Sequence, residues 1–214
     1  MSNLTGYNPE EVTMSINSIK NAYEELIACI GERVQNEIIN GMSDKWACAN
    51  AQKFYNEIFK PSVDGLLAGI NTTFESVVNA MNEAAQLWAN DCGEAFSPVA
   101  FALIMKNMDT SSICENIAGI RGIDLDQASQ VAAKLPSIAA DAESAVSKAS
   151  AAVDNCGFIG GAQAANLKAS LDVIKSNIST AVNDITTQTK VAFESTIATY
   201  GNTAGQISQA FAGN

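Results

Sequence analysis

Apolar residues recur every three or four positions along most of this 214-residue chain, and this spacing constrains the fold more than any other feature. Between residues 12 and 38 every step is three or four, which places the apolar positions on one face of a helix. These positions are Val12, Ile16, Ile19, Tyr23, Leu26, Ile30, Val34 and Ile38. A long helix with one apolar face needs partner helices to bury it, so the sequence predicts an all-α fold.

Capping signals predict the ends of the first helix. Asn8 is a suitable N-cap and Pro9 a suitable first helical residue. Glu11 lies three residues after the cap, as in a capping box, where a side chain at this position bonds back to the N-cap backbone. Gly41 is the predicted end of this helix.

A second apolar stripe predicts another long helix that begins near Trp46, with Ser43 or Asp44 as its cap. Pro61 falls inside this stripe. We expect it to kink the helix without ending it, because the stripe continues in register beyond it. The two helices form a predicted antiparallel hairpin over residues 1–93.

The second half repeats this organisation. Asp124 and Gln127 form a second capping-box pattern, followed by an alanine-rich stripe that contains Pro136. Asn155-Cys156-Gly157 ends the third predicted helix, and a fourth follows Gly160-Gly161. We interpret the two halves as a duplicated helical hairpin.

The predicted fold is therefore two long antiparallel helical hairpins that form an elongated four-helix bundle. The hairpins are residues 1–93 and 124–200, joined by a short helical connector over 94–123 and followed by a flexible tail over 201–214. Ser97-Pro98 and Ser112 with Glu115 resemble the caps of two short helices in the connector.

The connector is far longer than the 2–8 residues usual in helical bundles. This length favours a head-to-tail pair of hairpins, in which the connector runs along the bundle and covers a seam with Phe101 and Leu103. The alternative is a local connector that leaves both hairpin turns at one end.

Charge and composition exclude several classes of protein. With 12 basic and 23 acidic residues the net charge is -11, which repels nucleic acids and anionic lipids. The most apolar run, residues 98–105, is much shorter than the ~20 residues of a transmembrane helix. The first residues lack the basic region and apolar run of a cleavable signal peptide. Five cysteines at wide spacing match neither a disulfide framework nor a zinc site.

The residue types also argue against catalysis. The chain has no histidine, which removes Ser-His and Cys-His pairs and the commonest metal ligand. It has no Ser-x-x-Lys spacing and no phosphate-binding glycine loop. We therefore predict that the protein is not an enzyme, and we assign no catalytic, cofactor-binding or metal-binding residue.

The two predicted turns resemble the WxG family of small helical-hairpin proteins exported by type VII (ESX-like) secretion systems. The first turn motif is Trp46-Ala47-Cys48 and the second is Phe158-Ile159-Gly160. In this family the aromatic ring fills the open end of the groove between two helices, and a small third residue allows a tight turn. Cys48 stands where the family has glycine, and Phe158 where it has tryptophan.

The export signal of this family is a tyrosine followed four residues later by an acid, just after the hairpin. Trp88 and Tyr200 occupy that region here but lack the acid. Tyr7 and Glu11 have the spacing at the other end of the hairpin, where capping explains Glu11 better.

The resemblance implies a cytoplasmically synthesised protein that is exported without a cleavable signal peptide, to the medium or the cell surface. It would bind proteins, such as secretion machinery or a co-secreted partner. Family members typically dimerise head to tail, so a fused pair implies a monomeric pseudo-dimer or a weak homodimer. The alternatives are a helical pore-forming toxin component that uses residues 98–105 at a membrane, and an intracellular scaffold.

Aromatic residues divide into predicted core and predicted surface. Trp46, Phe54, Phe74 and Trp88 lie on the stripe of the second helix and are expected in the core. Tyr55 and Phe59 flank that stripe beside Pro61, which makes them the predicted partner-facing patch.

Overall fold

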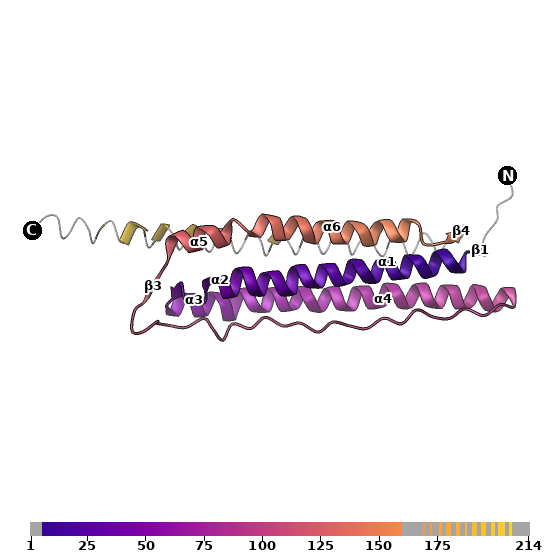
Figure 1. Ribbon diagram of the computed structural model, residues 1–214, viewed down its shortest axis with the longest axis horizontal. Coiled ribbons are helices and arrows are strands. Elements are labelled where there is room, and N and C mark those ends of the chain that lie inside the picture. The colour runs from indigo at the N-terminus through magenta and orange to yellow at the C-terminus, as the bar shows by residue number, and fades with distance from the viewer. Residues whose placement is uncertain are drawn as a thin grey trace, which may run out of the picture.

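The computed structural model describes residues 6–159 and scattered positions between residues 169 and 206. Within these residues, three long helical rods lie side by side, with an extended segment beside them (Figure 1). The first rod is α1 (Pro9–Ile27), η1 (Ala28–Ile39) and α2 (Asn40–Met42), where η denotes a π-helix. The second rod is α3 (Ala49–Lys53), η2 (Phe54–Phe59) and α4 (Lys60–Cys92), and the third is α5 (Leu125–Ala132) and α6 (Leu135–Asp154). The predicted all-α class is confirmed.

The predicted stripes of the first and third rods form much of the core. All eight stripe residues of the first rod are buried, from Val12 to Ile38. The third rod buries Ala128, Val131, Leu135, Ile138, Ala142, Ala145, Ala149 and Val153. Rod one is packed between the other two, with α1 in contact with both α4 and α6. Small alanine side chains on α6 allow its backbone to approach α1 closely.

The second rod begins later than predicted. Trp46 lies in a short strand, so neither Ser43 nor Asp44 caps a helix there. The cap is Cys48, whose Sγ accepts a hydrogen bond from the Ala51 N–H at 3.4 Å. The rod continues through Pro61, as predicted, and ends at Gly93, which adopts a left-handed conformation at φ 71°.

Two further expectations for the helices have mixed outcomes. The third helix is interrupted between α5 and α6, and Pro136 lies in the first turn of α6, where its missing N–H costs no hydrogen bond. The fourth helix and the tail, residues 162–214, lie outside the described residues apart from scattered helical positions. The four-helix arrangement depends on that part of the chain.

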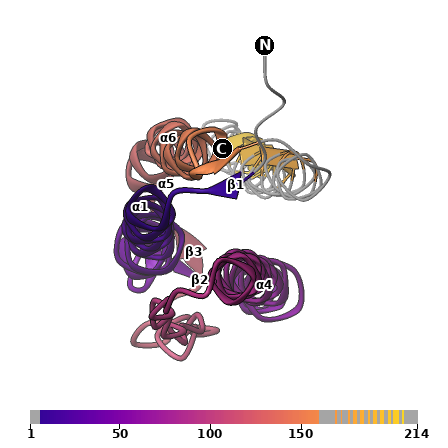
Figure 2. The same cartoon turned by 90° about the vertical axis from the view of Figure 1, so that its right-hand side faces the viewer.

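The predicted helical connector is wrong. Residues 94–121, here called the strap, contain no helix and run in an extended path along the first two rods, back to the end where β3 lies (Figure 1). Viewed along the bundle, the strap is a layer beside the pair formed by α1 and α4 (Figure 2). The predicted run along the bundle is therefore confirmed, but the strap covers that distance as an extended chain.

Side chains of the two rods hold the strap by bonding its backbone. Asn82 donates to the Val99 carbonyl and accepts from the Val99 N–H, both at 2.9 Å, and Gln35 makes the same pair of bonds to Asp109 at 2.9 and 2.8 Å. Tyr23 Oη accepts the Ile104 N–H at 2.7 Å. An extended backbone offers these unpaired groups, whereas a helix uses them internally, so the side chains favour the extended form.

The two residues predicted to cover the seam, Phe101 and Leu103, differ in burial. Phe101 is half-buried and lies against Tyr23, with 4.9 Å between the ring centroids. Leu103 is 40% exposed, so it does not cover the seam.

Two short antiparallel strand pairs, here called the clasps, join the ends of the rods. In one clasp β1 (Gly6–Tyr7) pairs with β4 (Phe158–Ile159), and in the other β2 (Trp46–Ala47) pairs with β3 (Gly122–Ile123). Each clasp thus joins residues of one predicted turn motif to the segment that precedes α1 or α5. The clasps lie at opposite ends of rod one, on the order of 50 Å apart by helical rise, so Trp46 and Phe158 of the two predicted turns lie at opposite ends of the described bundle.

The clasps also change the two predicted capping boxes. Asn8 and Asp124 both cap as predicted through their side chains, which accept the backbone N–H groups of Glu11 at 3.3 Å and Gln127 at 3.0 Å. Their own N–H groups, however, donate across the clasps, from Asn8 to the Gly157 carbonyl at 2.8 Å and from Asp124 to the Lys45 carbonyl at 2.7 Å. The return bond of each capping box is replaced by a bond to the other hairpin.

Gly157 should be essential for the clasp between β1 and β4. Its φ is 74°, and a Cβ there would meet the Val12 nitrogen at 2.9 Å and the Asn8 carbonyl oxygen at 3.0 Å. We expect Gly157→Ala to lower the free energy of unfolding by at least about 2 kcal/mol, measured by urea denaturation.

Gly69→Ala is the matched control, because Gly69 lies inside α4 with open space around it. This change should stabilise the protein by roughly 0.5–1 kcal/mol through helix propensity. Equal unfolding midpoints for the two variants would contradict the packing of α1 on Gly157.

Candidate interaction surfaces

The first turn is built on a buried aromatic cluster. Trp46, which is 2% exposed, packs with Phe54 and Tyr55, and Phe59 completes the group. Ring centroids within the cluster are 5.2–5.9 Å apart, the range in which tilted and edge-on aromatic pairs are favourable. The cluster fills the interior beneath the turn, as the predicted role of Trp46 requires.

The predicted partner-facing patch is wrong. Tyr55 is fully buried and Phe59 is 2% exposed, whereas Ile58, which α-helical spacing places on the same stripe as Phe54, is 47% exposed. The cause is the π-helix η2, in which each turn holds more residues than an α-helical turn. A stripe drawn with α-helical spacing therefore points in the wrong direction over residues 54–59.

Tyr55 is unusual within the cluster. Its Oη is buried and has no hydrogen-bond partner among the residues that the structure describes. Burial raises the pKa of Tyr55 well above the ordinary tyrosine value. Tyr23 is also buried and also has a raised pKa, mainly through burial, but its Oη donates to Asn71 Oδ1 at 2.7 Å and accepts the Ile104 N–H.

Cys48, the third residue of the first turn motif, occupies its position without backbone strain. Its φ is −172°, an extended conformation open to any residue, so this turn has no need of glycine. The side chain is buried and serves as the N-cap of α3. The cysteine that differs from the family pattern thus contributes a helix cap that glycine lacks.

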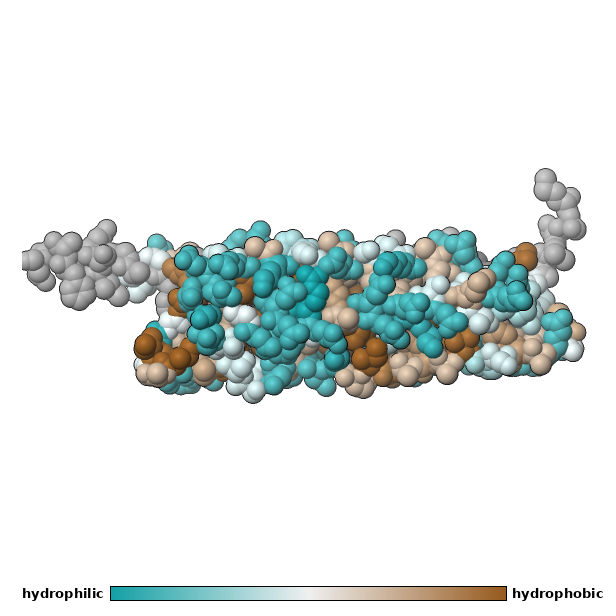
Figure 3. Space-filling model, in the orientation of Figure 1, coloured by the Kyte–Doolittle hydropathy of each residue, from teal (hydrophilic) through white to brown (hydrophobic). Residues whose placement is uncertain are grey.

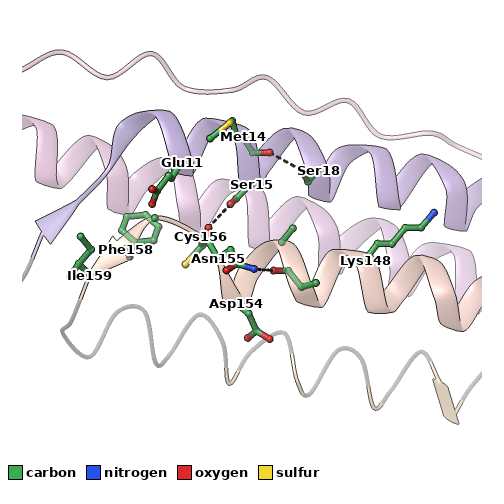
Figure 4. A pocket seen from close by; sticks show the side chains of 13 residues that line it. Glu11, Met14, Ser15, Ser18, Lys148, Asp154, Asn155, Cys156, Phe158 and Ile159 are labelled. Carbon is green, nitrogen blue, oxygen red and sulfur yellow. Dashed lines mark hydrogen bonds between the residues drawn. The ribbon is translucent and has the colours of Figure 1, made fainter.

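Only part of the second turn motif lies within the described residues. Phe158 lies half-buried in β4, opposite Tyr7, while Gly160 lies outside the described residues. A groove of about 750 Å³ separates the start of α1 from the end of α6 at this turn (Figure 4). Ser15 spans it by donating from Oγ to the Asn155 carbonyl at 2.9 Å.

Another groove, of about 510 Å³, runs between the first rod and α6 and is lined by charged side chains. Arg33 bonds Glu37 and Asp141 there, and Lys148 bonds Glu25 at 2.5 Å. Cys29 lies in the same groove, and burial raises the pKa of its thiol, which disfavours the nucleophilic thiolate. These contacts are those of a solvated ion-pair network.

Exposed apolar residues gather at the end of the molecule that holds the first turn. Residues 117–120, here called the hairpin tip, form a tight turn that exposes Ile120 by 72% and Ile117 by 36%. Beside it lies the end groove, of about 460 Å³, lined by Asp44, Lys45, Ala47, Ile117, Ile120, Gly122, Ile123 and Asp124. Figure 3 shows apolar surface at the end where Figure 1 places β3.

The hairpin tip was not among the predicted elements. Two isoleucines separated by Ala118-Gly119 match a two-residue β-turn, which was a usable signal.

Within the described residues, no group of three or more His, Cys, Asp or Glu side chains is placed to hold a metal ion, and none of the described helices is long and apolar enough to cross a membrane. All five cysteines are free thiols, with Cys92 exposed and Cys29, Cys48 and Cys156 buried.

Comparison with known proteins gives no relative. No protein-family model, curated protein or solved structure matches the chain. The resemblance to WxG proteins therefore rests on the turn motifs and the arrangement of the hairpins.

The hydroxyl groups of Tyr55 and Tyr23 should have opposite effects on stability. Tyr55→Phe removes a buried hydroxyl that lacks a partner in the described part of the chain, so we expect stabilisation of up to about 1 kcal/mol. Tyr23→Phe removes the hydrogen-bond partner of the Ile104 N–H and of Asn71 Oδ1 and should cost about 1–3 kcal/mol. Chemical denaturation at neutral pH measures both.

Tyr55→Phe and the wild type should lose different amounts of stability in alkaline solution. An unfolded tyrosine ionises near pH 10, and the raised pKa of Tyr55 keeps the folded form neutral beyond that point. Its contribution to stability is therefore present below about pH 10 and lost as the pH rises further. Tyr55→Phe should lose less stability than the wild type between neutral pH and pH 11, and an identical loss would contradict the burial of Tyr55.

Proposed function

We propose that this protein acts by binding other proteins, as a WxG-like helical-hairpin protein exported through a type VII secretion system. The observation that carries the proposal is the pair of clasps. Each aromatic turn is joined to the entry of the other hairpin, at opposite ends of the first rod. This is the covalent counterpart of the head-to-tail dimer typical of the WxG family.

Two further features support this proposal. Trp46 is buried above an aromatic cluster at its turn, which is the role that the family assigns to its turn aromatic. The hairpin tip exposes Ile117 and Ile120 side by side on one loop, where a binding protein would present apolar surface. Binding without catalysis also agrees with a chain that has no histidine.

Two alternatives make different predictions. A membrane-active component would use residues 98–105, which lie extended in the strap with Leu103 and Met105 exposed. An intracellular scaffold would bind partners through the same surfaces without leaving the cell.

Export is tested by fractionating cultures of the host with and without its type VII ATPase. We expect the protein in the medium or at the cell surface of the wild type, and retained in the cytoplasm of the ATPase deletion. An abundant cytoplasmic protein serves as the lysis control. Export that does not depend on the ATPase would rule out the proposed route, and retention in both strains would favour the scaffold.

The membrane alternative is tested with dye-loaded liposomes, with and without anionic lipid, over a range of pH. Our proposal predicts no dye release under any of these conditions. Release that is abolished by Met105→Asp would instead favour the membrane-active component.

A further inference from the structure

The hairpin tip is a rigid apolar projection. Ala118 and Gly119 have φ angles of 52° and 85°, the positive values that a type I′ turn requires at both central positions. Ile117 and Ile120 exchange two backbone hydrogen bonds of 2.9 Å, and Asn116 Oδ1 accepts the Gly119 N–H at 3.2 Å. The tip is therefore held in one conformation, which lowers the entropic cost of binding through it.

A positive φ is energetically unfavourable for a residue other than glycine, yet Ala118 has this conformation in the turn. Of the two isoleucines that flank the turn, Ile120 is the more exposed, at 72% against 36% for Ile117. Nothing in the fold of the described residues requires an isoleucine there. A binding role accounts for both features.

The tip forms one wall of the end groove, because Ile117 and Ile120 line it. Arg121 follows the tip, is exposed, and has no ion-pair partner within residues 6–159 or the scattered positions beyond. The charged residues that line the end groove are Asp44, Lys45 and Asp124, and Asp44 forms an ion pair with Lys45 at 3.4 Å, so the lining carries one net negative charge. Ala47 and Ile123 add apolar surface to it. The groove therefore offers apolar surface to the tip and one net negative charge to Arg121.

Complementary surfaces that lie side by side on one molecule can pair around a two-fold axis. Each tip then enters the groove of the other copy, and Arg121 of each copy meets the carboxylates of the other. Because the chain carries a net charge of -11, two copies repel each other on average, and a contact between them has to bring opposite charges together. The first-turn end combines an exposed isoleucine, the Arg121 cation and a groove lining with one net negative charge.

We propose that the first-turn end is a self-association site, in which the hairpin tip of one copy occupies the end groove of a second copy. The partner is thus another molecule of this chain, bound end to end. A contact built on one tip and one groove from each copy is small, so the dimer is weak and reversible. This inference does not depend on export, and its tests use the purified protein alone.

Sedimentation velocity over a wide concentration range tests the proposal. We expect the weight-average mass of the full chain to rise with concentration, and Ile120→Asp to weaken association at least about tenfold, because it places a charge in an apolar contact. Leu87→Asp is the control, since Leu87 is 61% exposed on α4, far from the tip, and should not affect association. Both side chains are exposed, so both variants should fold.

A charge exchange tests the geometry. Arg121→Asp and Asp44→Arg should each weaken self-association, because each creates two repulsive pairs in the homodimer. An equimolar mixture of the two variants should regain dimerisation, because the mixed dimer contains two attractive pairs. Added salt should weaken the wild-type dimer.

Several outcomes would overturn the proposal. They are a wild type that stays monomeric up to its solubility limit, an equal effect of Leu87→Asp, or a mixture that fails to regain dimerisation. Binding of the monomer to neutral phosphatidylcholine vesicles that is lost in Ile120→Asp would assign the tip to a lipid surface instead.

Discussion

Two backbone hydrogen bonds set the arrangement of everything else in this protein. The N–H of each helix-capping residue, Asn8 and Asp124, donates to a carbonyl in the turn of the opposite hairpin, at Gly157 and Lys45. A helix N-terminus has N–H groups to satisfy in any case, so each bond meets a local need and also fixes a distant segment. Because the two bonds lie at opposite ends of the first rod, the third rod is fixed in orientation as well as in contact with the first.

This arrangement determines what the connector must do. The first hairpin ends at Gly93, while the second begins at the far end of the bundle, so residues 94–121 have to travel its length. Asn82, Gln35 and Tyr23 bond the backbone of this segment at intervals. The strap is thus a structural layer that covers the seam between α1 and α4, and it delivers the hairpin tip to the first-turn end.

The buried and the exposed apolar side chains near the first turn differ from those that α-helical spacing predicts. The aromatic residues beside Pro61 are buried because η2 turns them inward, and the cluster they form supports Trp46. Two exposed isoleucines, Ile117 and Ile120, lie instead on a loop between helices. A rigid scaffold that presents a binding loop at one end is a common design, because loops can change without disturbing the core.

The sequence alone determined the elements that depend on local physics. Periodicity identified the buried faces of the first and third rods, from Val12 to Ile38 and from Ala128 to Val153, because one face of a helix must meet apolar partners. The caps at Asn8 and Asp124 were also predictable, because a side-chain oxygen satisfies N–H groups two or three residues away. Only the tertiary structure decided the rest. The strap is extended because side chains from other helices bond its backbone, and the capping residues direct their N–H groups across the clasps for the same reason. The inward turn of Tyr55 and Phe59 follows from a π-helix that α-helical spacing does not reveal. These outcomes depend on partners tens of residues away, which no local pattern specifies.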